Sequence, residues 1–384
     1  MIPLPALFLA LLRLGLTAFG GPAMVAYIRD LAVTRKRWLS EEAFADGAAL
    51  CQSIPGSTAL QMAAYVGLRT RGPAGALTTF VGFALPAFLL MMVLAAVYGV
   101  SRDLHAVASA FRGLHVIVVA LVANAAVNFG RSSIRDWRDA LLASGAAAFL
   151  FFRGSPILAI VGSAAVGALL YRGVNLPVQS LNATGQPGGR RTLRLALTAA
   201  LAGCAALAAL FVGNRLLFDL AAVMIKVDLF AFGGGFASLP VMLHQVVDLH
   251  HWMDSRTFMD GIALGQVTPG PIIITATFVA YRIAGPLGAI VGTAAVLAPS
   301  FLMVLITVPY FDRLQHSPLF RSSLRGVLAS FVGLLVAVTA QFASAAQWTP
   351  ASILLAVAAF VALRCKIDML WVVLAGAAIS IFVM

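Results

Sequence analysis

The chain has 384 residues, of which 61% are hydrophobic and 10% charged, and its mean hydropathy is +0.97. These values lie far outside the range of soluble proteins and indicate a polytopic membrane protein. The formal net charge is +12, but the arginines and lysines lie almost wholly between the apolar runs, as in cytoplasmic loops, which argues against a nucleic-acid-binding protein.

The first two apolar segments are each interrupted by helix-breaking residues. The run from Leu4 to Ile28 is broken at Phe19-Gly20-Gly21-Pro22, and the segment from Phe44 to Leu68 is broken at Pro55-Gly56. Glycine and proline in the middle of an apolar run stop a helix. We therefore expect neither segment to be a simple membrane span. The first twelve residues lack a basic leader and a cleavage site, so we expect no removable signal peptide.

Less interrupted apolar runs follow, at roughly 76–100, 114–129, 140–152 and 156–171. A polar, glycine-rich stretch at 172–194 reads as a linker, and one extra apolar run, 195–212, precedes the second half of the chain. A helix of about 20 apolar residues crosses roughly 30 Å of hydrocarbon, so we expect most of these runs to be membrane helices.

The second half of the chain repeats the first at a nearly constant offset. Phe19-Gly20-Gly21 recurs as Phe232-Gly233-Gly234, and the stretch Asp46 to Gly56 recurs as Asp260 to Gly270, 213 or 214 positions later. Such a fixed offset indicates a duplication. The sequence predicts two repeats, 1–171 and 217–384, joined by residues 172–216, which hold the linker and the extra helix.

The distribution of basic residues indicates how the two repeats are oriented, because these residues mark the cytoplasmic side. If both broken segments dip into the bilayer and return, eighteen Arg and Lys residues fall inside and six outside; if both span, the split is fifteen against nine. In either case the single extra helix inverts the second repeat. We expect an all-α polytopic membrane protein with a cytoplasmic N-terminus, built from two inverted-topology repeats whose broken or re-entrant helices meet near the midplane, as in many secondary transporters.

The breaks are the candidate binding site, because lipid cannot satisfy the backbone groups that a broken helix exposes. Half-helix N-termini favour an anion, hydroxyl and amide groups can donate to it, and glycines let it approach the main chain. The alternative is that the glycines only allow close helix packing or kinks. The predicted binding residues are Gly20, Gly21, Pro22, Gln52, Ser53, Pro55, Gly56, Ser57, Thr58, Gly233, Gly234, Gly235, Gln266, Thr268, Pro269 and Gly270.

Charged side chains inside the apolar runs are also candidates, since each costs at least about 2.5 kcal/mol at the bilayer centre. Arg13 and Lys226 occupy equivalent positions before the two Phe-Gly-Gly breaks and could supply positive charge to an anion. Asp46 and Asp260 are likewise equivalent, and we expect them to couple transport to protons. The alternative for these two carboxylates is an interfacial position at a helix N-terminus. Arg325 and its equivalent, Arg112, read as anchors that reach the membrane surface.

Several other kinds of function lack a signal in this sequence. His244, His250 and His251 have no accompanying Cys or Glu cluster, so we expect no metal site. No phosphate-binding loop is present, so we expect no ATP drive within this chain, and without a dinucleotide fingerprint or a cysteine pair we expect no enzyme and no cofactor. Three scattered cysteines read as free thiols.

The duplicated motifs resemble those of a known family. Leu16-Thr17-Ala18-Phe19-Gly20-Gly21-Pro22 and Leu50-Cys51-Gln52-Ser53-Ile54-Pro55-Gly56, with their second-half counterparts, are similar to the chromate ion transporter family in its long-chain, two-domain form. The resemblance covers both halves. It implies export of chromate across the bacterial plasma membrane, giving resistance, with sulfate as the related oxyanion. Gly235 stands where the first half has Pro22, so the two breaks need not share one geometry.

Some properties stay open at this stage. We expect a proton gradient as the driving force, while an importer of a sulfate-like oxyanion and an anion channel are the alternatives built on the same repeats. The direction, the coupling ion, the oligomeric state, for which a homodimer is the candidate, and the choice between spanning and re-entrant breaks are not fixed by the sequence.

Overall fold

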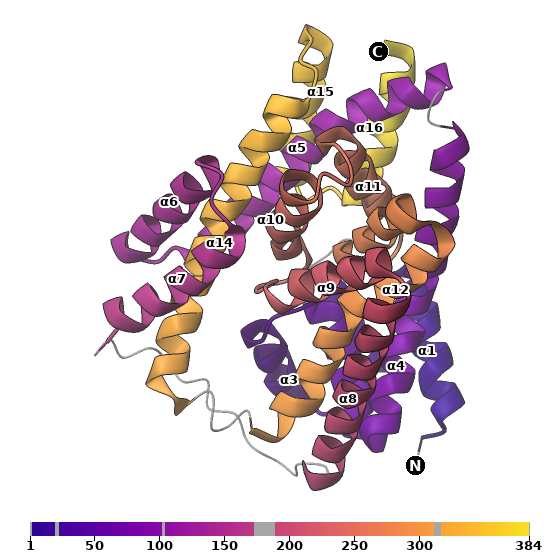
Figure 1. Cartoon of the computed structure of the whole chain (residues 1–384), viewed down its shortest axis with the longest axis vertical. Helices are drawn as coiled ribbons and strands as arrows, with labels where there is room; N and C mark the ends of the chain where they lie inside the picture. The colour runs from indigo at the N-terminus through magenta and orange to yellow at the C-terminus, as the bar shows by residue number, and fades with distance from the viewer. Residues whose placement is uncertain (1, 20–22, 102–103, 173–188, 311–315, 384) are drawn as a thin grey trace. The chain divides into compact units, whose positions relative to one another are not determined.

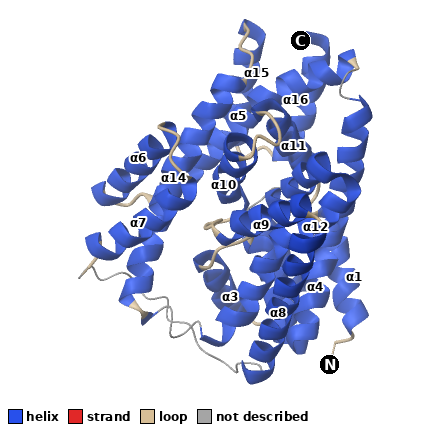
Figure 2. Ribbon diagram, in the orientation of Figure 1, coloured by secondary structure: helices blue, strands red, loops and turns tan. Residues whose placement is uncertain are grey.

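A computed structural model of the chain describes residues 2–19, 23–101, 104–172, 189–310 and 316–383 (Figure 1). These residues are almost entirely helical, and none of them lies in a strand (Figure 2). Five of the described helical segments are long and apolar enough to cross a membrane: 58–101, 105–133, 192–213, 272–310 and 318–345. The prediction of an all-α polytopic membrane protein is confirmed.

The helices of the first repeat end and begin at the predicted breaks. Helix α1 (Leu4–Thr17) precedes the first break, after which α2 (Ala23–Arg29) continues as a π-helix, Asp30–Arg35. Helix α3 (Glu41–Ser53) precedes the second break, and α4 (Thr58–Ser101) follows it. The chain then forms α5 (His105–Ser133), α6 (Trp137–Phe151) and α7 (Pro156–Leu170). Gly20, Gly21 and Pro22 lie outside the described residues.

The second repeat follows the same order after the extra helix α8 (Gly189–Gly213). Helix α9 (Arg215–Leu229) precedes a 3-10 turn (Gly235–Ala237), α10 (Ser238–Leu243) and a second π-helix (His244–Leu249). Then come α11 (Ser255–Val267), a 3-10 turn (Ile272–Ile274) and α12 (Thr275–Thr307), which ends in a further turn, Val308–Tyr310. The last helices are α14 (Pro318–Ala345), α15 (Pro350–Arg364) and α16 (Met369–Val383).

Helices α4 and α12 are each bent at the same place in the duplicated sequence. In α4, Arg71 and Gly72 leave the helical conformation, and Gly72 has a φ of 65°. In α12, Ala284 and Gly285 do the same, with a φ of 63° at Gly285. A proline follows each glycine and cannot donate a helical hydrogen bond, so the helix restarts there. In each repeat, a short helix therefore precedes the Pro-Gly break and a long, bent helix follows it: α3 and α4 in the first repeat, α11 and α12 in the second.

The chain divides into two compact units, and each unit contains parts of both repeats. Unit 1 comprises 1–90, 175–238 and 269–321, and unit 2 comprises 91–174, 239–268 and 322–384. In unit 1, α9 packs along α12, and α8 contacts both (Figure 1). Helix α8 is exposed along nearly its whole length, as expected of a helix whose outer face meets lipid. The repeats are thus interleaved in the fold.

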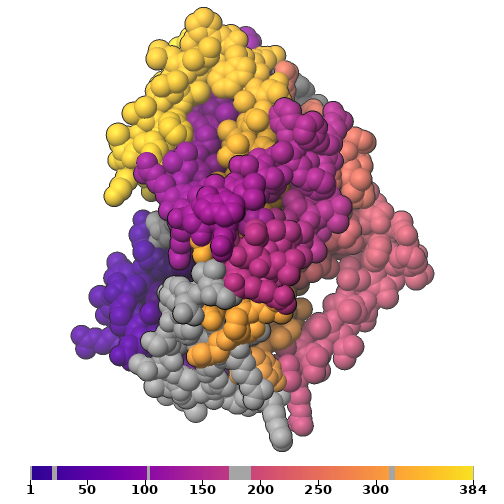
Figure 3. Space-filling view, turned by 90° about the vertical axis from the view of Figure 1, so that its left-hand side faces the viewer, coloured from indigo at the N-terminus to yellow at the C-terminus, as the bar shows by residue number. Residues whose placement is uncertain are grey.

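In unit 2, α5 lies in the centre and is contacted by α11, α15 and α16. Its residues Leu114 to Val122 are buried without interruption. Helices α15 and α16, in yellow in Figure 3, instead present apolar side chains such as Leu354 and Phe382 at the surface. Such an apolar surface would be a liability in water and is ordinary in a bilayer.

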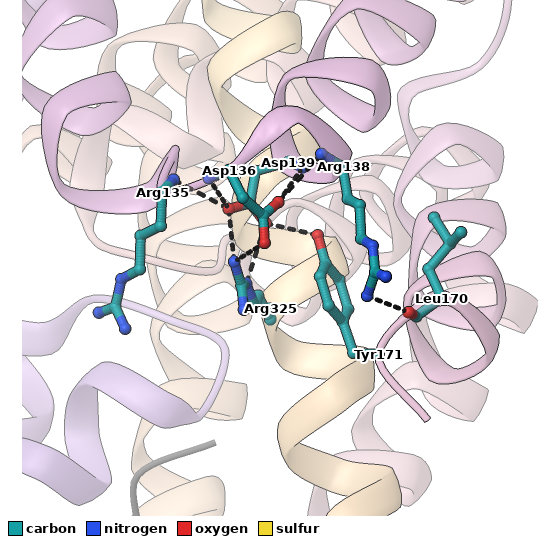
Figure 4. Close-up of polar contacts among 7 residues, drawn as sticks. All are labelled: Arg135, Asp136, Arg138, Asp139, Leu170, Tyr171 and Arg325. Atoms are coloured by element: carbon teal, nitrogen blue, oxygen red, sulfur yellow. Dashed lines mark hydrogen bonds and ion pairs between the residues drawn. The ribbon is translucent and has the colours of Figure 1, made fainter. Parts of the chain in front are cut away.

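An ion cluster in unit 2 joins the two repeats (Figure 4). Asp136 caps α6, and Arg325 on α14 donates to Asp136 at 2.7 Å and to both carboxylate oxygens of Asp139 at 3.0 and 2.8 Å. The hydroxyl of Tyr171 also donates to Asp139, and its ring lies under the guanidinium group. The side chain of Arg325 is 15% exposed and that of Asp139 is fully buried. The prediction that Arg325 is a surface anchor is therefore wrong, because two carboxylates of the other repeat hold it inside; Arg112 is exposed.

Candidate functional site

The breaks of the two repeats meet in unit 1 through a reciprocal pair of backbone hydrogen bonds. The N–H of Gly56 donates to the carbonyl oxygen of Ala231 at 2.7 Å, and the N–H of Gly270 donates to that of Ala18 at 3.0 Å. Ala18 and Ala231 each lie just before a Phe-Gly-Gly motif. Each Pro-Gly break is therefore bonded to the Phe-Gly-Gly break of the other repeat, and backbone groups that lipid could not satisfy are paired inside protein.

Glycine is required at both Pro-Gly breaks. Gly56 has a φ of 119° and Gly270 a φ of 121°, a region that other residues rarely adopt. A Cβ at Gly56 would also collide with the hydroxyl of Ser300, and one at Gly270 would lie 2.5 Å from the Cβ of Ala87. Close packing and backbone conformation both explain these glycines. The glycines therefore do serve close packing, as the alternative interpretation holds. This packing role is compatible with a role in the site.

The glycines of the second Phe-Gly-Gly motif leave more room. Gly233 and Gly234 have φ values of 88° and 109°. Among the described residues, a Cβ on Gly234 would meet only the hydroxyl oxygen of Thr58, at 4.0 Å. The structure therefore brings together two predicted binding residues, Gly234 and Thr58, from different repeats. Gly235, also predicted, begins the 3-10 turn and packs near Ile272.

A buried carboxylate that the sequence analysis did not select lies at the start of α4. Asp228 on α9 accepts hydrogen bonds from the backbone N–H of Ser300 at 2.7 Å and from its hydroxyl at 3.0 Å. The same hydroxyl accepts the N–H of Ser57, a predicted binding residue, at 2.9 Å. Asp228 and Ser300 are both fully buried. The rule that selected Lys226, a charge inside an apolar run, applies equally to Asp228 two residues later.

The remaining predicted residues near the first break have more ordinary surroundings. The hydroxyl of Ser53 donates to the carbonyl oxygen of Ala49, one turn back in its own helix, and Gln52 is exposed. The carbonyl oxygen of Pro55 accepts the side-chain amide of Gln61 at 2.6 Å. Arg13 and Lys226 are both exposed on their helices. These last two charges therefore lie at the surface, whereas Asp228 is buried at the break.

Asp260, one of the two predicted proton-coupling residues, lies in a buried cluster of unit 2. One of its carboxylate oxygens is 2.6 Å from Nε2 of His115, and the other accepts the hydroxyl of Tyr98 at 2.7 Å. Asp260 is 6% exposed and His115 is 8% exposed. Its equivalent, Asp46, is only partly buried, so the two aspartates have different surroundings. His115 and Tyr98 were missed because a single histidine or tyrosine in an apolar run gives no pattern.

Gln266 and Thr268, at the end of α11, are both buried in unit 2. The hydroxyl of Thr268 donates to the carbonyl oxygen of Gly265 at 2.9 Å. The side-chain nitrogen of Gln266 has no hydrogen-bond partner among the described residues. Pro269 is buried and begins the break that Gly270 completes. In the parts of the chain that the structure describes, no three His, Cys, Asp or Glu side chains lie close enough to hold a metal ion.

Comparisons with known proteins agree with the duplicated architecture. The chromate transporter family matches residues 5–168 and again residues 218–381. An uncharacterized transporter of Methanocaldococcus jannaschii is 42% identical over 96% of this chain and 91% of its own length. The chromate transport protein of Pseudomonas aeruginosa is 33% identical over 88% and 81%, and that of Cupriavidus metallidurans is 30% identical over 84% and 79%.

No solved structure matches this fold at a significant level. The sequence match nevertheless extends through both repeats and includes the breaks, the buried Asp228 and the Asp260 cluster. This chain belongs to the chromate transporter family.

Proposed function

We propose that this protein exports chromate, or a sulfate-like oxyanion, across the bacterial plasma membrane with its N-terminus in the cytoplasm, and so confers resistance to chromate. Membership of the chromate transporter family supports transport of chromate across a membrane. The relatives from P. aeruginosa and C. metallidurans are named as chromate transport proteins, which supports the same substrate here. Export, resistance and a homodimeric assembly are part of the proposal.

The observation that carries the proposed site is the reciprocal bonding of the two breaks through Gly56 and Gly270. It brings the beginning of α4 beside the second Phe-Gly-Gly motif in one unit. Backbone N–H groups at a half-helix N-terminus, with the hydroxyls of Ser57 and Thr58, suit a tetrahedral dianion such as chromate. The other predicted binding residues would complete the site from the flanking segments.

We further propose that export is driven by protons that bind at Asp260. A buried carboxylate in hydrogen-bond contact with a histidine can share a proton with it, so that the pair takes up and releases the proton. His115 makes this contact with Asp260, and the hydroxyl of Tyr98 donates to the other carboxylate oxygen. Asp46 is the second candidate, since it holds the equivalent position in the first repeat.

Transport in everted membrane vesicles tests the proposal. Vesicles that contain the protein should accumulate chromate against its gradient when the lumen is acidified, and sulfate should compete better than phosphate if size and charge decide binding. Control vesicles lack the protein. If the ratio of lumenal to external chromate never exceeds its electrochemical equilibrium value, the protein is a channel. If chromate accumulates only in right-side-out vesicles, the protein is an importer.

A further inference from the structure

The start of α4, where the oxyanion is proposed to bind, already contacts a negative group of the protein, the carboxylate of Asp228. The Asp228 carboxylate takes the N–H and the hydroxyl of Ser300, and through that hydroxyl it is linked to the N–H of Ser57. These donors are the kind that a bound oxyanion would use. An oxyanion and this carboxylate would therefore compete for the same hydrogen bonds.

The other break lacks such a carboxylate, although the two are duplicates. The residues equivalent to Asp228, Ser300 and Ser57 are Gly15, Ala87 and Pro271, none of which has a side chain that could hold or donate to an anion. A Cβ at Gly15 would lie 2.5 Å from the carbonyl oxygen of Phe83, so the packing of α1 on α4 excludes an aspartate there. The internal carboxylate is thus specific to the break that precedes α4.

Gln61 is a second buried polar residue at this break. Gln61 is fully buried; its side-chain nitrogen donates to Pro55, while its side-chain oxygen has no donor among the described residues. The position that a Cβ of Gly56 would take lies 2.6 Å from that side-chain nitrogen, so Gln61 lies directly against the break. The break before α4 therefore has a buried acceptor without a donor, as well as the carboxylate of Asp228.

Asp228 is fully buried, and the groups that donate to its carboxylate are the backbone N–H and the hydroxyl of Ser300. Among the described residues, no charged side chain balances its negative charge. The charged residues on its own helix and on the neighbouring helices are Arg215, Asp219 and Lys226 on α9, Arg190, Arg191 and Arg194 on α8, Arg282 on α12, Glu41, Glu42 and Asp46 on α3, and Arg69 and Arg71 on α4. A proton is therefore the direct means of neutralising Asp228.

We propose that Asp228 is an internal competitor of the transported oxyanion, and that it must take up one proton before the oxyanion can bind the donors at the start of α4. The proton converts the carboxylate to a carboxylic acid and removes one negative charge from the site. The oxyanion then accepts the hydrogen bonds of Ser57 and Ser300. This inference rests on the proposed function, because it requires that the oxyanion binds at this break.

Binding of labelled sulfate to the purified full-length protein tests the competition. Sulfate is the probe because its charge stays constant near neutrality, whereas chromate itself takes up a proton there. If one proton is bound with each anion, the affinity of the wild type should fall about tenfold for each unit of rising pH. Asp228→Asn should remove this dependence and keep the higher affinity throughout. Asp219→Asn, an exposed carboxylate on the same helix, is the matched control and should behave like the wild type.

Asp228→Asn protein that keeps the tenfold dependence would overturn the competition and leave the proposed function intact. Wild-type protein that binds neither sulfate nor chromate at any pH would instead overturn the proposed function. Infrared difference spectra of the wild type provide a readout that does not depend on the folding of a variant. Addition of sulfate or chromate at neutral pH should produce the C=O band of a newly protonated carboxylic acid, and a spectrum without that band refutes the proposal.

Discussion

Two constraints exclude a side chain at Gly56: its positive φ and the close approach of Ser300 and Gln61 to the position of a Cβ. Mutation can separate the two. Gly72 also has a positive φ, but no atom of the described residues lies within 4 Å of the position its Cβ would take. Gly72→Ala should therefore cost only the backbone strain, about 1–3 kcal/mol. Gly56→Ala adds a collision with Ser300 and Gln61 at the break.

We expect both variants to show a lower thermal stability and only Gly56→Ala to lose oxyanion transport by more than about tenfold, which corresponds to roughly 1.4 kcal/mol. Melting temperature and chromate flux, measured on the same preparations, distinguish the two effects. Equal transport by the two variants would remove Gly56 from the site.

Asp260 and Asp46 are equivalent in sequence, but the buried histidine partner belongs to Asp260. Asp260→Asn should abolish the accumulation of chromate against its gradient that an imposed pH gradient drives, because an amide cannot exchange the coupling proton. His115→Gln should weaken that accumulation, since it removes the imidazole that contacts the carboxylate. Asp46→Asn is the comparison, and we expect it to keep the accumulation. Accumulation in vesicles at fixed external chromate and varied lumenal pH measures all three.

For single residues, the sequence indicated which positions matter, but it did not indicate which side chains they contact. Glycine, proline and aspartate at fixed, duplicated positions were enough to find Gly56, Gly270 and Asp260. Hydrogen bonds from residues more than 70 positions away, such as those from Ser300 to Asp228, leave no local pattern. Partners of this kind require the fold.

Helices α6 and α14 are joined by the cluster of Asp136, Asp139 and Arg325. Asp139 lies before the apolar run of α6. Burial by itself would raise the pKa of this carboxyl group, but the hydrogen bonds from Arg325, Tyr171 and the backbone lower it to about 2, from an ordinary value of 3.8. Because the folded-state pKa is the lower one, this stabilisation is present above the ordinary value and is lost as the pH falls toward 2.

Arg325→Gln should destabilise the protein by about 3–5 kcal/mol at neutral pH, because it leaves the buried carboxylate of Asp139 without its cation. The deficit should shrink as the pH is lowered, since protonation then neutralises the unpaired Asp139. Adding Asp139→Asn should restore part of the stability. Thermal unfolding in detergent at several pH values measures this, and a deficit that does not change with pH would contradict the account.

The positions of the helix breaks were predictable because proline and glycine act locally. The end of α3 at Ser53 and the start of α4 at Thr58 agree with the expectations. The extra helix α8 is present, but it begins at Gly189, inside the stretch 172–194 that was predicted to be a linker. The bend at Arg71-Gly72-Pro73 was not singled out, although Gly-Pro is a strong break signal, because it falls between an apolar run and its neighbour and reads as a loop. The two π-helices carry no signal in the composition of their segments.

The whole molecule does not fold as one repeat beside the other. Each compact unit combines segments of both repeats, so a single repeat contains only part of either unit. Periodicity and internal similarity define the repeats, but they do not say which helices pair. That pairing depends on contacts between distant segments, which leave no pattern in the sequence.

Expression of the halves tests this interleaving. Residues 1–180 alone, and residues 181–384 alone, should fail to give a folded, detergent-soluble protein. Expressed together, the two fragments should copurify, with chromate transport restored to within a few fold of the intact chain. Folding is read by size-exclusion chromatography and thermal unfolding. A stable, monodisperse first fragment on its own would contradict the interleaved arrangement.

The two π-helices, Asp30–Arg35 and His244–Leu249, lie 214 positions apart, at the same point of each repeat. A π-helix is rare, and it occurs mostly as a single widened turn within an α-helix, frequently at a functional site. The widened turn is therefore a feature that both repeats share next to their breaks, whereas Asp228 and its equivalent Gly15 differ between them.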